Sequence, residues 1–150
     1  MDPERPATCV LLMGLPASGK SSFYHEQFRD THVRVNKDML KTANREKLLV
    51  DVCVQTQMPF VVDKVNETRL ARAKYIPAAR AKGFRVIGYY FRSDPPSCVR
   101  RNALREGAAR IPVPAIYGFA KRFEPPTYDE GFDELYMVTL VDGVFKVVPV

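Results

Sequence analysis

Eight residues near the start of the chain, Gly14 to Ser21, limit the possible folds more than any other stretch. They match the phosphate-binding pattern G-x-x-x-x-G-K-[ST] at every specified position. Gly14 and Gly19 are expected to adopt positive φ angles, which would let backbone N–H groups surround an anion. Lys20 would bring its charge to nucleotide phosphates, and the Ser21 hydroxyl would bind Mg²⁺. The expected ATP contacts are Gly14, Leu15, Pro16, Ala17, Ser18, Gly19, Lys20, Ser21 and Ser22.

The sequence on either side of this loop has the context that the motif requires. Residues 8–13 form a short apolar run, typical of a buried parallel strand. Residues 22–29 are expected to form a helix, whose N-terminal dipole would face the same phosphates. The alternative is a glycine-rich turn in an unrelated fold, and this context disfavours it.

Strands and helices are expected to alternate along the rest of the chain. Further strands are predicted at 31–36, 60–63, 85–91, 136–141 and 144–148, and helices at 39–55, 67–82, 97–104 and 115–123. The pair Asp142–Gly143 indicates a hairpin between the last two strands. The pattern predicts an α/β, P-loop NTPase-type three-layer fold with a parallel central sheet, a helical lid and a C-terminal strand hairpin.

For two of the predicted helices, the sequence also predicts which residues face the core and which residues cap or end the helix. Leu40, Leu48 and Val52 should face the core from the helix at 39–55. Asn66 or Thr68 should cap the helix at 67–82, which Gly83 should end.

Two carboxylates follow predicted strands, Asp38 after the second and Asp63 at the end of the third. Ligands bind beyond the carboxyl ends of the strands in such sheets, so both should lie beside the phosphate-binding loop. Asp63 would help to hold Mg²⁺, and Asp38 would accept a proton from an incoming hydroxyl group. For either residue the alternative role is capping the following helix.

The segment from 105 to 114 has no clear period and is expected to be a loop between helices. Its arginines, Arg105 and Arg110, make it a candidate lid that would neutralise charge on the transferred phosphoryl group. Together with the phosphate-binding loop and the two carboxylates, this segment predicts an ATP-dependent, Mg²⁺-dependent kinase that acts on an acceptor hydroxyl.

The net charge of +6 is unevenly placed, because the segment from Lys64 to Arg110 holds twelve basic and three acidic residues. Such an excess favours a polyanionic partner such as nucleic acid, or the phosphates of a nucleotide. A solvated basic face is the alternative. The three cysteines and two histidines are not spaced as a disulfide framework or a zinc site.

The length of 150 residues fits one P-loop kinase domain over 1–150. The sequence has neither an apolar run long enough to span a membrane nor the apolar core of a signal peptide. We therefore expect no membrane association and a cytoplasmic location, or a nuclear one if the source is eukaryotic.

Several motifs together resemble the 5′-hydroxyl polynucleotide kinase module of polynucleotide kinase–phosphatases. The resemblance runs from about 10 to 138, and its most specific parts are the lid and the Lys-Arg-Phe-Glu-Pro-Pro-Thr stretch at 121–127. The motifs are the loop at 14–21, Val-Asn-Lys-Asp at 35–38, Val-Asp-Lys-Val-Asn at 62–66, Arg-Arg-Asn-Ala-Leu-Arg-Glu at 100–106, Ile-Pro-Val at 111–113, Tyr-Gly-Phe-Ala-Lys-Arg-Phe-Glu-Pro-Pro-Thr at 117–127 and Glu-Gly-Phe at 130–132.

The resemblance implies a role for individual residues. Lys20, Asp38 and Arg105 would be catalytic: Lys20 on the ATP phosphates, Asp38 as the base for the acceptor 5′-OH, and Arg105 as the lid arginine. Ser21 and Asp63 would bind the metal. The acceptor, DNA or RNA, would be contacted by Lys41, Asp63, Asn66 and Arg101.

The sequence departs from the family pattern at two places. Val65 stands where a threonine often precedes the asparagine, and Lys41 stands where arginine can bind a phosphate with two hydrogen bonds. Related kinases phosphorylate hydroxymethylated DNA bases or small alcohols, so these remain alternative acceptors. A non-catalytic, ATP-dependent nucleic-acid-binding module is the alternative from another class.

Overall fold

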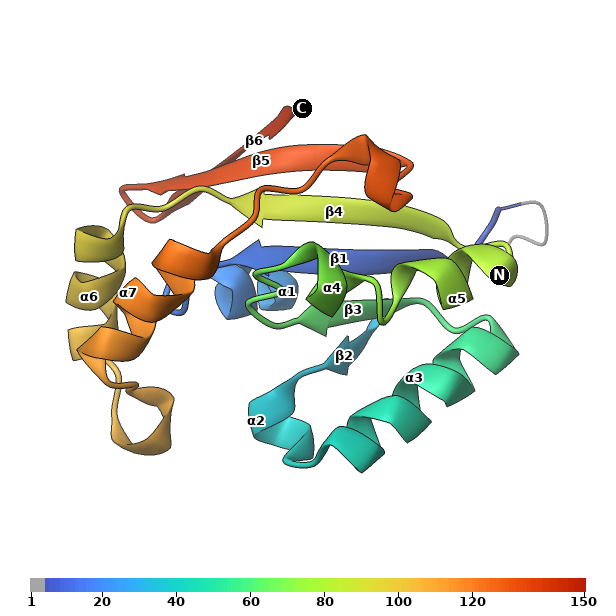
Figure 1. The fold of residues 1–150 in the computed structure, drawn as a ribbon, viewed down its shortest axis with the longest axis horizontal. Helices are drawn as coiled ribbons and strands as arrows, with labels where there is room; N and C mark the ends of the chain where they lie inside the picture. Colours follow the sequence, from blue (N-terminus) through green and yellow to red (C-terminus); the bar gives the residue numbers. More distant parts are fainter. Residues whose placement is uncertain (1–4) are drawn as a thin grey trace.

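A six-stranded sheet forms the centre of the computed structural model, which describes residues 5–150. The strand order is β2-β3-β1-β4-β5-β6 (Figure 1). The first five strands are parallel to their neighbours, and β6 runs antiparallel to β5. The strands are β1 (Thr8–Gly14), β2 (Val33–Val35), β3 (Phe60–Asp63), β4 (Arg85–Phe91), β5 (Glu134–Val141) and β6 (Val144–Pro149). The predicted fold class is confirmed.

Helices cover both faces of the sheet, as a mostly parallel sheet requires. The α-helices are α1 (Lys20–Gln27), α2 (Lys37–Leu40), α3 (Ala43–Thr56), α4 (Arg69–Arg72), α5 (Ile76–Ala81), α6 (Pro95–Ala103) and α7 (Val113–Arg122). Two short 3₁₀ turns, η1 (Gly107–Ala109) and η2 (Tyr128–Glu130), precede and follow α7. No helix among residues 5–150 is both long and apolar enough to cross a membrane.

Alternate residues of the central strands enter two different cores, because successive side chains of a strand point to opposite faces. On one face, Leu11 of β1 packs with residues of α3 and α5, including Cys53 and Ile76. On the other face, Leu12 packs with Phe23 of α1. Figure 1 accordingly shows α1 behind the sheet and α5 in front of it.

The helix expected at 39–55 is two helices, so this prediction was wrong in its bounds. Lys41 has a φ of 71°, which no helix interior allows, and the Thr42 side chain then caps α3 by accepting a hydrogen bond from the Arg45 N–H. The expected core positions Leu48 and Val52 are exposed, and Leu40 alone of the three packs against the core.

The helix expected at 67–82 is also interrupted, into α4 and α5. Thr68 caps α4 through the Ala71 N–H. Asn66 is not a cap: its φ is 49°, and its side-chain amide donates to the Leu12 carbonyl oxygen at 2.7 Å. Gly83 follows α5 with a φ of 79°, as expected of a residue that ends a helix.

A third, smaller core joins α6 and α7 to the phosphate-binding loop. Leu15 and Ala17 of the loop pack with Cys98 of α6 and Ile116 of α7, and all four are buried. Figure 1 shows α6 and α7 side by side at the end of the sheet where β1 and β4 finish. The segment between these helices is therefore held next to the loop.

Candidate active site

The phosphate-binding loop joins β1 to α1, and its two glycines serve different purposes. Gly19 has a φ of 104°, the positive value expected of it. Gly14 does not have a positive φ, which corrects that expectation. Position 14 requires glycine because it has no room for a side chain: a Cβ there would lie 2.8 Å from the Phe91 Cβ and 3.0 Å from the Ser18 Oγ. The other left-handed residue of the loop is Ala17, with a φ of 62°.

The amino end of α1 is the natural anion site of this loop. No side chain caps the helix at Gly19. The first-turn N–H groups of a helix have no partner within the helix, and together with the helix dipole they attract a negative group. The local structure that the motif predicts is therefore present.

Lys20 lies beneath the loop with its ammonium group turned back toward it. Its Nζ donates to the carbonyl oxygens of Gly14 at 2.9 Å and Leu15 at 2.7 Å. Burial lowers the pKa of Lys20 to about 8, a shift that Asp63 partly offsets and Arg105 reinforces. The charge that would attract phosphate therefore titrates just above neutral pH.

Ser21 and Asp63 meet at the edge of the sheet, as expected of a metal-binding pair. The Ser21 hydroxyl donates to Asp63 Oδ2 at 3.0 Å, although the two residues lie 42 positions apart. Arg34 of β2, which the sequence analysis did not single out, donates to the same carboxylate oxygen from Nε at 2.9 Å and from Nη2 at 2.7 Å. Asp63 is buried, and this ion pair balances its charge.

The donor chemistry of this pair fits Mg²⁺. The ion prefers hard oxygen ligands and is usually held by one or two protein groups together with substrate phosphates. One hydroxyl and one carboxylate beside a phosphate-binding loop meet that need. Clusters of three or more His, Cys, Asp or Glu side chains, which a site formed by protein alone would use, do not occur within residues 5–150.

A cavity of about 510 Å³ opens beside the loop, and we call it the main cavity. Lys20, Ser21 and Asp63 line it on one side, and Asp38 lines it from α2. Asn36, not Asp38, caps α2: its side chain accepts a hydrogen bond from the Met39 N–H at 3.1 Å and donates to the Asp63 carbonyl oxygen at 3.1 Å. The capping alternative for Asp38 is therefore wrong, and its carboxylate is exposed at the cavity.

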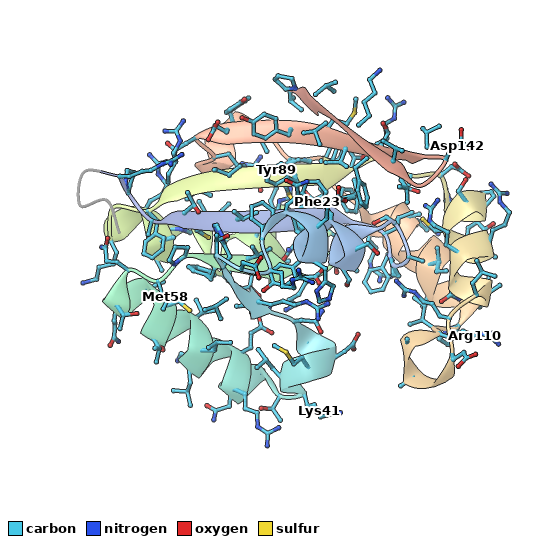
Figure 2. All side chains as sticks on the ribbon, turned by 180° about the vertical axis from the view of Figure 1, so that it is seen from behind. Phe23, Lys41, Met58, Tyr89, Arg110 and Asp142 are labelled. Atoms are coloured by element: carbon cyan, nitrogen blue, oxygen red, sulfur yellow. The ribbon has the colours of Figure 1, made fainter. Side chains whose placement is uncertain are left out.

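The segment after α6 supplies another wall of the main cavity. Arg105 and Phe119 line it from the lid and from α7. Arg110 lies outside it, because its guanidinium group donates to the carbonyl oxygens of Ala103 and Arg105 at the end of α6. In Figure 2, Arg110 lies at the outer side of this segment, near the end of α6. Of the two candidate lid arginines, only Arg105 reaches the cavity.

Asn66 closes the third side of the main cavity and is held by a buried network. Arg72, which is fully buried, donates to the carbonyl oxygens of Asn66 and Glu124, both at 2.9 Å, and forms an ion pair with Glu130. The Asn66 amide is occupied by the Leu12 carbonyl oxygen. The geometry thus gives Asn66 a bracing role at the cavity wall.

Two of the expected acceptor contacts lie outside the main cavity. Lys41 is exposed at the end of α2, where Figure 2 shows it at the outer rim of the molecule. Arg101 donates from Nε to the Ala17 carbonyl oxygen at 2.6 Å, so it braces the phosphate-binding loop from the α6 side. Arg101 also lines a second cavity of about 410 Å³, together with Arg92, Ser93 and residues of β5.

The basic segment from Lys64 to Arg110 is less free than its composition suggests. Among the residues that the structure describes, five of its twelve basic side chains form ion pairs with carboxylates elsewhere in the chain, and these five would lose a partner on binding a polyanion. These pairs are Lys64–Glu46, Arg69–Asp129, Arg72–Glu130, Arg80–Asp133 and Arg85–Glu134. Acidic residues at 129–134 thus neutralise four of these five basic side chains.

Sequence reasoning missed Arg34 and the capping role of Asn36, and both left a signal. Arg34 lies between two valines in a strand that should be buried, so its charge requires a partner. In register, Arg34 pairs with Val61, which shares a face with Asp63 two residues on. Asn36 precedes the helix by one residue, the ordinary position for an N-cap.

Comparisons with known proteins show what this chain is similar to. The chain is 28% identical over 127 residues to a bifunctional polynucleotide phosphatase/kinase of Schizosaccharomyces pombe, covering 82% of this chain and 31% of that protein. The chain thus spans about a third of that relative's length.

Solved structures share the fold at low sequence identity. A gluconokinase from Sinorhizobium meliloti 1021 superposes with a TM-score of 0.61 at 17% identity, covering 91% of this chain and 84% of that one. Chaetomium thermophilum Kti12, solved in complex with ADP-AlF3, superposes with a TM-score of 0.67 at 12% identity, covering 89% and 90%. These likenesses establish a P-loop kinase-like fold.

A model of the family described as AAA domain matches residues 9–126. The matched region includes the phosphate-binding loop, Asp38, Asp63 and the segment 105–114. Because this match spans most of the sequence, the chain belongs to the AAA domain family.

Proposed function

We propose that this protein transfers the γ-phosphoryl group of ATP, with Mg²⁺, to a hydroxyl acceptor, and that the acceptor is the 5′-OH of a polynucleotide. The observation that carries the proposal is that the predicted phosphate, metal, base and lid residues line one cavity. These five residues come from four separate parts of the chain: Lys20 and Ser21 from α1, Asp63 from β3, Asp38 from α2 and Arg105 from the segment after α6. Convergence of a phosphate site, two carboxylates and a lid arginine is what phosphoryl transfer to a hydroxyl requires.

Each wall of the main cavity has a defined task in this proposal. The loop and Lys20 hold the β- and γ-phosphates, and bound Mg²⁺ would neutralise charge that develops on them. Asp38 is exposed and free of helix capping, so its carboxylate can accept the proton of the attacking hydroxyl. Arg105 lines the cavity from the segment after α6 and would stabilise the transferring group.

A polynucleotide is the preferred acceptor for three reasons. Lys37 and Lys74 line the main cavity and suit a phosphate backbone. Phe119 presents an aromatic ring on which a base could stack. The Schizosaccharomyces pombe relative is named for polynucleotide phosphatase and kinase activities.

The nucleoside part of ATP is assigned to the second cavity. That cavity is lined by Arg101, whose Nε also donates to the Ala17 carbonyl oxygen of the phosphate-binding loop. Donor nucleoside and acceptor would then occupy different cavities. This assigns Arg101 to the donor, whereas the family resemblance implied a contact with the acceptor.

The test is transfer of labelled phosphate from ATP to two oligonucleotides, one with a free 5′-OH and one with a blocked 5′ end. Asp38→Asn should lower transfer to the free end by about a hundredfold or more, because it removes the base. Asp51→Asn is the matched control, since Asp51 is an exposed carboxylate on α3 away from the cavity. It should retain normal transfer.

Other outcomes point to the alternatives. Label on the blocked strand would indicate a hydroxyl on a base, and label only on small alcohols would exclude the polynucleotide. Tight ATP and polyanion binding without any product would indicate a non-catalytic binding module. Full activity in Asp38→Asn would remove Asp38 as the base.

A further inference from the structure

Arg34 contacts Ser21 of the phosphate-binding loop and Asp63 of β3, although it does not itself line the main cavity. Its Nη2 donates to the Ser21 Oγ at 3.0 Å and to Asp63 Oδ2 at 2.7 Å, and its Nε donates to Asp63 Oδ2 at 2.9 Å. One guanidinium group therefore bridges the hydroxyl and the carboxylate that the proposed function assigns to Mg²⁺.

The surroundings of Arg34 hold it in this place. It is the central residue of β2, flanked by Val33 and Val35, and its strand is paired with β3 in parallel register. The Tyr24 ring of α1 lies 5.5 Å from the guanidinium carbon, which adds a cation–π contact. Its side chain keeps 20% of its surface exposed, against 2% for Asp63. Arg34 thus shields the Asp63 carboxylate from solvent, while its own side chain stays partly exposed.

A divalent ion on the Ser21 hydroxyl would lie close to this arginine. Mg²⁺ binds oxygen at about 2.0–2.1 Å. With Arg34 Nη2 3.0 Å from the same oxygen, the two cations could be separated by no more than about 5 Å. A single and a double positive charge at that distance repel each other strongly in a partly buried site. The Ser21–Asp63 hydrogen bond can stay, whereas the Arg34–Ser21 contact opposes the metal.

We infer that Arg34 is a resident cation that competes with Mg²⁺ for the Ser21–Asp63 pair, so that it positions this pair and weakens the dependence of nucleotide binding on the metal. The inference rests on the proposed function, since it takes Ser21 and Asp63 as the metal ligands. Arg34 is a positioning residue here, because it acts through these two side chains and is not required to touch the nucleotide.

The first test measures the affinity for a non-hydrolysable ATP analogue by calorimetry, with Mg²⁺ and with EDTA. The ratio of the two affinities reports how much the metal helps. Arg34→Gln should increase this ratio by about tenfold or more over wild type, because the competing charge is gone. Arg34→Lys keeps a charge but not the two-pronged contact, so its ratio should lie between those of wild type and Arg34→Gln. Arg85→Gln, which breaks the exposed pair with Glu134, is the matched control and should keep the wild-type ratio.

The second test needs no nucleotide. Mn²⁺, a spectroscopic substitute for Mg²⁺, is titrated into the nucleotide-free protein and followed by electron paramagnetic resonance. Arg34→Gln should bind Mn²⁺ about tenfold more tightly than wild type or Arg85→Gln. A purely structural role of Arg34 would not tighten metal binding.

The outcomes separate this inference from the proposed function. If all variants bind the analogue with the same metal ratio and bind Mn²⁺ equally, Arg34 does not compete with the metal, while the kinase proposal stands. If wild type fails to bind the analogue, the kinase proposal is overturned, and the Mn²⁺ titration still decides the role of Arg34. Should Arg34→Gln fail to fold, Arg34→Lys must show the same direction of change, and a ratio equal to wild type would overturn the inference.

Discussion

Lys20 is the residue whose chemistry burial changes most clearly at the site. Its ammonium group is enclosed beneath the phosphate-binding loop and is stabilised by two carbonyl oxygens. Carbonyl dipoles do not replace the hydration of a full charge, and burial therefore lowers the pKa of Lys20 to about 8. Bound phosphates would restore the charged form, so proton uptake and nucleotide binding should be linked.

The linkage predicts how nucleotide affinity depends on pH. Well below its pKa of about 8 Lys20 is charged in the free protein, so affinity should fall by only about twofold between pH 7 and 8. Above its pKa of about 8 the residue loses its proton and must regain it on binding, so affinity should fall by up to about tenfold per pH unit. Calorimetry with an ATP analogue from pH 7 to 9.5 measures this fall. Lys20→Gln should bind weakly with no such pH step, and a wild-type affinity unchanged up to pH 9.5 would contradict the prediction.

The short helix α2 matters at the scale of elements, because it carries Asp38 on only four residues. A helix of one turn has little stability of its own. Asn36 holds it by capping its first turn and by donating to the Asp63 carbonyl oxygen. One side chain thereby sets the position of Asp38 relative to β3.

Asn36→Ala should reduce stability by about 1 kcal/mol, as loss of an N-cap generally does. It should also slow phosphoryl transfer by about tenfold to a hundredfold, because Asp38 would lose its placement. Thr42→Ala is the matched control, since Thr42 caps α3 through the Arg45 N–H in the same way. Denaturant unfolding should show similar losses for both variants, while steady-state kinetics should show a loss for Asn36→Ala alone. Equal kinetics in the two variants would argue against the positioning role.

Long-range ion pairs join the C-terminal segment to the front of the sheet at the scale of the whole molecule. Arg72 and Glu130 are separated by 58 positions, and both side chains are buried. The same arginine holds the Asn66 and Glu124 carbonyl oxygens, so it links the main cavity to the residues that follow α7. Breaking a buried pair leaves an uncompensated charge, whereas an exposed pair contributes little.

Arg72→Met should therefore lower the free energy of unfolding by about 3–5 kcal/mol, because Glu130 would remain buried without its partner. Arg85→Gln removes an exposed pair with Glu134 and should cost no more than about 1 kcal/mol. Urea denaturation of both variants measures the difference. If Arg72→Met does not fold, Glu130→Gln tests the same pair, and a loss as small as that of Arg85→Gln would show that the pair does not hold the fold together.

Much of the fold was predictable because local patterns and global structure agree. The buried strands, the hairpin at Asp142–Gly143 and the loop at 14–21 each have strong local signals. The helix expected at 39–55 was wrong in its bounds for a local reason that periodicity does not reveal. Apolar spacing continued across Lys41, where a φ of 71° ends α2.

The site was predictable only in part. Lys20, Ser21, Asp38, Asp63 and Arg105 were expected to converge, and they line one cavity. Lys41 and Arg101 were expected there and lie elsewhere, because a residue's place in a motif does not say which way its side chain turns. Their functional roles remain predictions for the experiments above.

The amino-acid sequence by itself determined the α/β class and the position of a phosphate-binding loop, because both depend on short-range periodicity and on glycine at particular positions. Only the tertiary structure decided which residues pair with Asp63 and which basic side chains of the segment 64–110 form ion pairs. Arg34 reaches Asp63 through the register of β2 against β3, and Arg72 reaches Glu130 across the fold. Such pairings depend on how distant elements pack, which no local pattern encodes.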